Sequence, residues 1–142
     1  MHSENVRVHA IRLRPGQDLR AEIESYAQAQ RIQAGWIVSC VGSLTQIHLR
    51  FANQTGGTIA NGHFEIVSLV GTVSISGCHL HLCVSNNTGH TAGGHLLYEN
   101  RIYTTAEIII GESKDLQFTR KEDAANGWKE LHIEKKEEDN VL

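Results

Sequence analysis

The residues best suited to chemistry are two histidines in an apolar stretch, Cys78-His79-Leu80-His81-Leu82-Cys83-Val84. Successive side chains of a β-strand point to opposite faces, so His79, His81 and Cys83 share one face and the leucines occupy the other. Two imidazoles at positions i and i+2 can both bind one metal ion, and buried leucines on the opposite face would fix the register of the strand. The spacing therefore predicts a pair of metal ligands on one strand.

A third imidazole is available from His95, which follows the glycine pair Gly93-Gly94. Glycines let backbones approach closely, so this segment can lie against the strand that carries His79 and His81. Three imidazoles with a fourth position left to water suit zinc or another borderline divalent ion. The competing interpretation is that all three are exposed or hydrogen-bonded histidines, because a His-x-His pair alone is a weak signal. Cys83 is a further candidate ligand, although packing as a small hydrophobe is the more ordinary role for it.

Two carboxylates, Glu65 and Glu107, lie inside otherwise apolar stretches. A buried acid needs a partner, so each is expected either on a solvent-exposed strand face or beside a hydrogen-bond donor. Near a metal ion, either could orient a histidine or act as a general base, which leaves a metal-dependent enzyme acting on a small molecule as an alternative. The sequence contains no GxSxG elbow and no glycine-rich phosphate-binding motif.

The segments that would position these residues are mostly strands. Apolar Val6, Val8 and Ala10 alternate with polar residues, which predicts a half-buried strand over Val6–Leu13. The only strongly periodic helix is expected over about Asp18–Arg31, with Asp18 as its N-cap. Further strands are expected over Trp36–Val41, Leu44–Phe51, His63–Ile75, Gly77–Ser85 and Tyr103–Gly111, with short edge strands at Asp115–Thr119 and Glu130–Ile133.

This order of elements predicts the fold class. One helix against many strands excludes a doubly wound α/β fold and favours an α+β fold, in which a mostly antiparallel sheet carries one helix on one face. The 142 residues and 15.7 kDa suit a single domain, with a core from about residue 6 to residue 133 and a charged tail over residues 134–142.

Composition limits the partners and the compartment. Thirteen basic residues against sixteen acidic ones give a net charge of −3, which argues against a protein that holds nucleic acid by charge alone. The three cysteines show no CxxC pair, which is typical of reduced thiols in a cytoplasmic protein, or a nuclear one in a eukaryote. No apolar run is long enough for a membrane helix, and no signal peptide is recognised, so no membrane partner is expected.

Several motifs, in the same order along the chain, resemble the plants and prokaryotes conserved (PPC) domain. The segment Gly62–Thr72 (GHFEIVSLVGT) is similar to the family's GRFEILSLSGT signature. The HLH segment at 79–81 and the GGHL segment at 93–96 resemble the histidine pair of its prokaryotic members, and Thr104–Ile108 resembles its closing strand. The resemblance runs from about Val6 to Ile133.

The resemblance implies a homotrimer built from an antiparallel sheet with one packed helix. Some stand-alone prokaryotic members resemble zinc proteins, and the matching ligands here are His79, His81 and His95. In plant members an AT-hook contacts DNA, and protein partners bind in part through the stretch that matches Gly62, His63, Phe64, Glu65, Ile66 and Val67. This sequence has no AT-hook, and His63 replaces the arginine of the signature.

We therefore expect a trimeric binding or assembly module with a divalent metal site, zinc being the first candidate. A metal-dependent enzyme that uses Glu65 or Glu107 as base is one alternative. A DNA-binding regulator is the other, and the net charge ranks it last.

Overall fold

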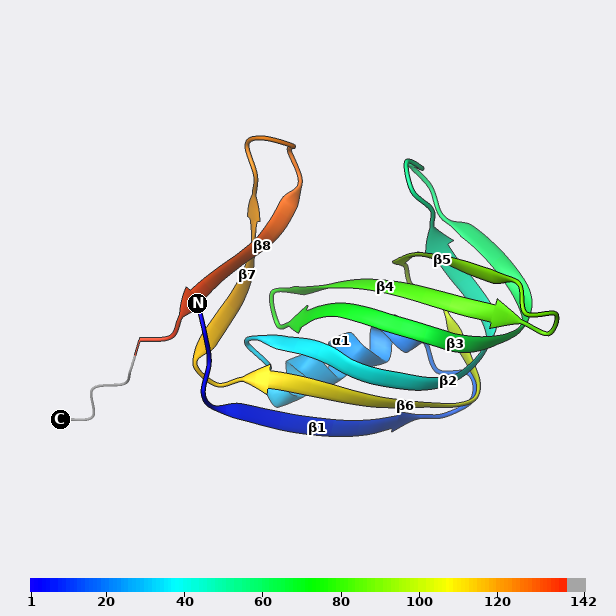
Figure 1. The fold of residues 1–142 in the computed structure, drawn as a ribbon, viewed down its shortest axis with the longest axis horizontal. Helices are drawn as coiled ribbons and strands as arrows, with labels where there is room; N and C mark the ends of the chain where they lie inside the picture. Colours follow the sequence, from blue (N-terminus) through cyan, green and yellow to red (C-terminus); the bar gives the residue numbers. More distant parts are fainter. Residues whose placement is uncertain (138–142) are drawn as a thin grey trace.

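Over residues 1–137, which the computed structural model describes, the chain forms an antiparallel six-stranded sheet with one helix on one face (Figure 1). The strands lie in the order β1 (Val6–Leu13), β6 (Arg101–Ser113), β2 (Gly35–Arg50), β3 (Thr58–Ser74), β4 (Gly77–Asn86) and β5 (Thr91–Leu96). Helix α1 (Leu19–Gln30) packs on this sheet, and strands β7 (Leu116–Glu122) and β8 (Lys129–Lys135) form a separate hairpin. The predicted α+β fold is confirmed. The end of the predicted charged tail, residues 138–142, lies outside the described residues.

Helix α1 begins where the sequence predicts. The Asp18 carboxylate accepts hydrogen bonds from the backbone N–H groups of Arg20 and Ala21 at 3.0 and 3.3 Å, which satisfies donors that the first turn leaves free. The helix buries Leu19 and Ile23 completely against the sheet. The sheet contributes apolar side chains to the same core, among them Leu44, Leu49, Leu80, Leu82, Ile108 and Ile110. Within residues 1–137, no helix has the length and apolar composition needed to cross a membrane.

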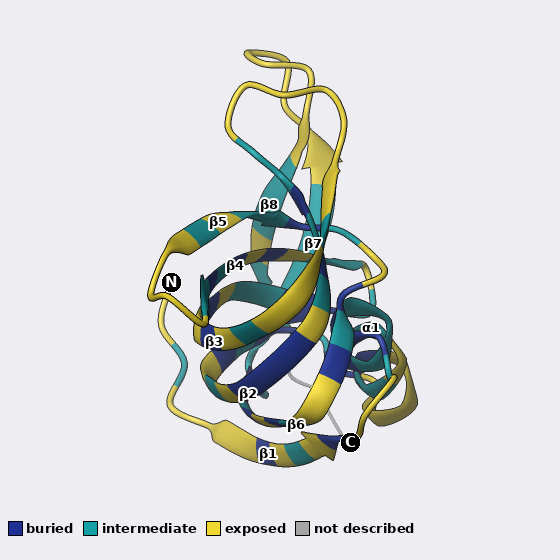
Figure 2. Ribbon diagram, turned by 90° about the vertical axis from the view of Figure 1, so that its right-hand side faces the viewer, coloured by how far each residue is buried: buried dark blue, intermediate teal, exposed yellow. Residues whose placement is uncertain are grey.

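The apolar pattern of β1 predicts the wrong buried face. Val6 and Val8 are 51% and 65% exposed, whereas His9 and Leu13 are buried on the helix side. Burial of His9 is tolerated because its Nε2 atom lies 3.0 Å from a carboxylate oxygen of Glu112. The valines instead belong to the outer face of the sheet, the face away from helix α1. Figure 2 shows much of β1 in the colour of exposed residues.

Strand β5 comes from a glycine-rich segment that the sequence does not mark as a strand. It pairs with β4 on one side, where His81 lies opposite His95, and with the end of β2 on the other, where Arg50 lies opposite His95. Gly94 is required for this pairing, because a Cβ atom at this position would lie 2.7 Å from the Arg50 carbonyl oxygen. Strands β2 to β5 therefore close on themselves at one end of the sheet.

The hairpin of β7 and β8 replaces the two short edge strands that the sequence predicts. Its strands pair with each other and not with an edge of the main sheet. Figure 1 shows the hairpin rising beside the turn between β3 and β4, and its outer half is exposed (Figure 2). Arg120 of β7 donates a hydrogen bond of 2.7 Å to Thr72 Oγ1 on β3, which ties the hairpin to the sheet.

Candidate metal centre

Three histidine side chains converge on the outer side of strands β4 and β5. His79 and His81 lie two residues apart on β4, and His95 lies directly opposite His81 on β5. Each offers a ring nitrogen, and these nitrogens all lie within 4.8 Å of one another. The Nε2 atoms of His79 and His81 are 3.2 Å apart. Tetrahedral ligands of zinc, at metal–nitrogen distances of about 2.05 Å, are separated by roughly 3.3 Å, so the spacing of this pair suits a shared metal ion.

The alternation of strand β4 accounts for this arrangement. Leu80 and Leu82 are buried in the core, and His79 and His81 are exposed on the opposite face, as the sequence predicts. Strand β3 comes close to the first histidine because Gly71 adopts a φ of +138°, where a Cβ atom would collide with the His79 carbonyl oxygen.

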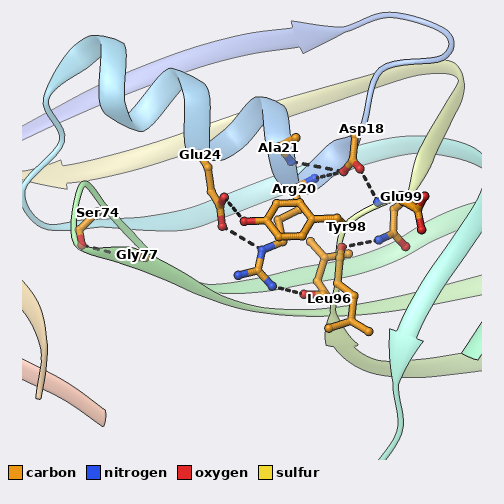
Figure 3. A network of polar contacts seen from close by, with 11 residues as sticks. Asp18, Arg20, Ala21, Glu24, Ser74, Gly77, Leu96, Tyr98 and Glu99 are labelled. Carbon is orange, nitrogen blue, oxygen red and sulfur yellow. Dashed lines mark hydrogen bonds and ion pairs between the residues drawn. The ribbon is translucent and has the colours of Figure 1, made fainter. Parts of the chain in front are cut away.

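Helix α1 fixes the backbone that follows His95 through a group of polar contacts (Figure 3). Arg20 donates from Nη1 to the Leu96 carbonyl oxygen at 2.7 Å and from Nε to Glu24 at 2.9 Å. Glu24 also accepts a hydrogen bond of 2.6 Å from the Tyr98 hydroxyl, and the Arg20 guanidinium lies over the Tyr98 ring. The third histidine is thus positioned by the helix as well as by its neighbouring strands.

The surroundings of two of the imidazoles, those of His95 and His79, favour the neutral form. Burial lowers the pKa of His95 to about 4, and positive charge on His79 and Arg50 acts in the same direction. Burial also lowers the pKa of His79, assisted by His81 and Arg120. Neutral imidazole is the form that binds a metal ion. The Nδ1 atom of His95 is buried and has no hydrogen-bond partner among the described residues, so protein groups leave this nitrogen without a contact.

Two pockets adjoin His79, and both are lined in part by the β7–β8 hairpin. The smaller has a volume of about 230 Å³ and is lined by His79 and His81 together with Val70 of β3. The larger, here called the hairpin pocket, has a volume of about 430 Å³. Its lining includes His79, His95, Arg50, Arg120, Trp128 and Glu130. Three ligands and an adjoining pocket leave room for a fourth, exchangeable ligand.

The cysteines contribute little to this centre. Cys83 lies on the same strand face as the histidines, but within residues 1–137 it is not part of the group of potential metal ligands that His79, His81 and His95 form. Cys78 lines the hairpin pocket, but burial raises the pKa of its thiol to about 11, so the thiol stays protonated at neutral pH.

The structure does not bring Glu65 and Glu107 to the histidines. Glu65 lies opposite Ser85 near the far end of β4, and Glu107 lies on β6. Both are exposed, which agrees with the outward orientation that their strands predict. The carboxylate that lines both pockets is Glu130 of β8. No local pattern marks it, because the fold of the hairpin alone places it beside His79.

The Gly62–Val67 stretch also lies apart from the histidines, in the first half of β3. Most of its side chains are exposed, but Ile66 is buried in the core. The His63 ring packs edge-on against Tyr103 of β6, with ring centroids 4.6 Å apart. His63 therefore packs against a neighbouring strand of the sheet and is not part of the metal centre.

Known proteins are similar to this chain in sequence and in fold. A model of the Plants and Prokaryotes Conserved (PCC) domain matches residues 2–114. A bifunctional protein GlmU from a Synechococcus strain is 47% identical over 131 residues, which are 92% of this chain, and the chain spans only 21% of that relative's length. A hypothetical protein from Salmonella cholerae-suis is 40% identical with a TM-score of 0.91, over 94% of this chain and 99% of the other. The metal-containing protein AF0104 from Archaeoglobus fulgidus shares the fold, with 24% identity and a TM-score of 0.81 over 92% and 96% of the two chains.

Proposed function

This chain belongs to the Plants and Prokaryotes Conserved (PCC) domain family, and from that premise we propose a homotrimeric binding or assembly module that holds a divalent metal ion. The ligands are His79, His81 and His95, and zinc is the first candidate ion. The observation that carries the proposal is the convergence of three imidazole nitrogens within 4.8 Å. The description of AF0104, which has the same fold, as a metal-containing protein supports it.

The metal ion would act first on the strands that supply its ligands. His81 and His95 form a cross-strand pair, so an ion bound to both would cross-link β4 to β5. Strand β5 has only six residues, and its glycines offer few side-chain contacts, so such a link would add to its stability. The fourth coordination position is left to a solvent molecule or a ligand.

The apolar outer face of the sheet supports the trimeric part of the proposal. Five valines from β1, β2 and β3 are between 55% and 65% exposed, although their strands pack a full core on the other side. They are Val8, Val38, Val41, Val67 and Val70. Exposed apolar surface of this extent is typical of an interface between subunits. Val67 belongs to the Gly62–Val67 stretch, through which we also propose contacts with protein partners.

Metal content tests the proposal directly. We expect untagged protein to contain about one divalent ion per chain by elemental analysis, as a single three-histidine site requires. His79→Ala and His95→Ala should each remove most of this metal. His90→Ala is the matched control, because His90 is an exposed histidine of the turn between β4 and β5 and lies outside the cluster. Stoichiometric metal that survives both ligand substitutions would show that the site is elsewhere.

A metal-dependent enzyme acting on a small molecule is the second candidate function, and the hairpin pocket is the observation that favours it. Glu130, which lines that pocket, takes the place of Glu65 and Glu107 as the candidate general base. Turnover of a substrate that Glu130→Gln abolishes, at unchanged metal content, would favour the enzyme over the binding module.

A further inference from the structure

Two arginines lie beside the three histidines without a carboxylate partner. Arg50 of β2 is the cross-strand neighbour of His95, and Arg120 of β7 lines the hairpin pocket beside His79. Within residues 1–137, neither guanidinium forms an ion pair. Arg120 donates to the Thr72 hydroxyl at 2.7 Å, which holds its side chain at the pocket but leaves its charge unbalanced.

The charge of this region becomes more positive when a metal ion binds. Three neutral imidazoles balance none of the two positive charges of a divalent ion. The carboxylate among the described lining residues is Glu130, and it already accepts a hydrogen bond of 3.2 Å from Asn126. A positively charged pocket that is partly shielded from water favours an anionic ligand.

The shape of the hairpin pocket suits a small organic molecule. Its volume of about 430 Å³ lies within the roughly 300–1,000 Å³ of typical small-molecule sites. Trp128 lines it with an indole side chain that is 67% exposed, and Lys129 adds a further positive charge. Both residues, like Arg120, belong to the β7–β8 hairpin, which lies beyond the family-matched residues 2–114. The pocket therefore combines residues of the family-matched segment with residues of the hairpin that follows it.

We propose that the hairpin pocket binds a small organic oxyanion, a carboxylate or a phosphate, between the metal ion and the guanidinium groups of Arg50 and Arg120. One oxygen of the ligand occupies the fourth coordination position, and the arginines bind the others in the paired geometry that guanidinium forms with oxyanions. The apolar part of the ligand packs on Trp128. This inference rests on the proposed metal site.

The test uses zinc-loaded protein and two probes, phenyl phosphate and phenylacetate, followed by isothermal titration calorimetry. We expect at least one probe to bind, and Arg50→Gln and Arg120→Gln each to weaken its binding tenfold or more at unchanged metal content. Lys121→Gln is the matched control, because Lys121 is the next residue of the hairpin and pairs with Glu134 outside the pocket. Cobalt-loaded protein supplies a second measurement, since ligation of the ion by the probe changes its visible spectrum. The tighter probe identifies the oxyanion class.

Two results would overturn the inference while the proposed function stands. One is metal-loaded wild-type protein that binds neither probe at 10 mM. The other is equal binding by Arg120→Gln, Arg50→Gln and the wild type. A wild-type protein that binds no divalent metal would instead contradict the proposed function, and with it the inference. Elemental analysis of the same samples separates these cases.

Discussion

At the scale of single residues, Glu112 is a carboxylate that is completely buried and still ionised at neutral pH. It lies on β6 beneath helix α1, where His9 Nε2 is 3.0 Å from one of its oxygens and Lys114 Nζ is 3.1 Å from the other. Burial raises the pKa of Glu112, but the hydrogen bonds from His9 and Lys114 outweigh burial and hold the pKa below its ordinary value. The ionised carboxylate thus stabilises the folded chain.

Replacing Glu112 with Gln should lower the free energy of unfolding by on the order of 1–3 kcal/mol at neutral pH, because the buried donors lose a charged acceptor. A carboxylate with a depressed pKa contributes stability above its unfolded pKa, about 4.3 for Glu, and this contribution disappears as the pH falls through the folded-state pKa. Urea denaturation should therefore show the difference between variant and wild type narrowing in acid. Glu107→Gln, on the exposed face of the same strand, should change stability by less than about 0.5 kcal/mol. Equal stability of Glu112→Gln and wild type at neutral pH would contradict this account.

The histidines show which properties of single residues can be predicted from the sequence. His79 and His81 were predictable because strand alternation is a local property, and the apolar leucines between them mark the buried face. His9 was not, because its burial depends on a carboxylate more than one hundred positions away in the sequence. For the same reason, the alternation of Val6 and Val8 predicts the wrong face of β1 as the buried one.

At the scale of elements, helix α1 and strands β2 to β4 could be predicted because each carries its own periodicity and turn residues. Strand β5 could not, because its segment Thr-Ala-Gly-Gly-His-Leu has little intrinsic preference for a strand and is held by its two neighbours. The position of the β7–β8 hairpin relative to the main sheet could not be predicted from the sequence either. It depends on tertiary contacts such as that between Arg120 and Thr72.

Gly94→Ala tests whether the closure of β5 onto β2 supports the metal centre. The added Cβ would lie 2.7 Å from the Arg50 carbonyl oxygen, so the two backbones must separate. We expect a loss of about 1–3 kcal/mol in the free energy of unfolding and a lower metal content, since His95 is the adjacent residue. Urea denaturation and elemental analysis measure the two effects.

Gly56→Ala is the control for this substitution, because a Cβ atom at Gly56 would have no neighbour within 4 Å. It should leave both stability and metal content unchanged. If Gly94→Ala destabilised the chain but kept its metal, the closure of β5 would be structural and independent of the site.

At the scale of the whole molecule, the two proposed functions use different surfaces: the hairpin pocket serves ligand binding, and the outer face of the sheet serves assembly. The hairpin pocket gathers arginines, an exposed tryptophan and the histidines. The outer face of the sheet gathers valines from three strands that residues 1–137 leave uncovered. Each chain has a net charge of −3, so a trimer would carry −9. This negative charge opposes binding to the phosphate backbone, so a DNA-binding regulator stays the lowest-ranked function.

Val41→Glu tests the assembly. Val41 is 60% exposed near the middle of the outer face, so a glutamate there leaves the single chain able to fold but places a charge in the proposed interface. A threefold assembly would bury three such charges together, which costs several kcal/mol for each unpaired ion. We expect sedimentation equilibrium to give three times the 15.7 kDa chain mass for the wild type and close to the single mass for Val41→Glu. Ile133→Glu, on the hairpin, should remain trimeric. A wild-type monomer would contradict the proposed trimer. A trimer that survives Val41→Glu would show that the subunit interface lies outside the valine face.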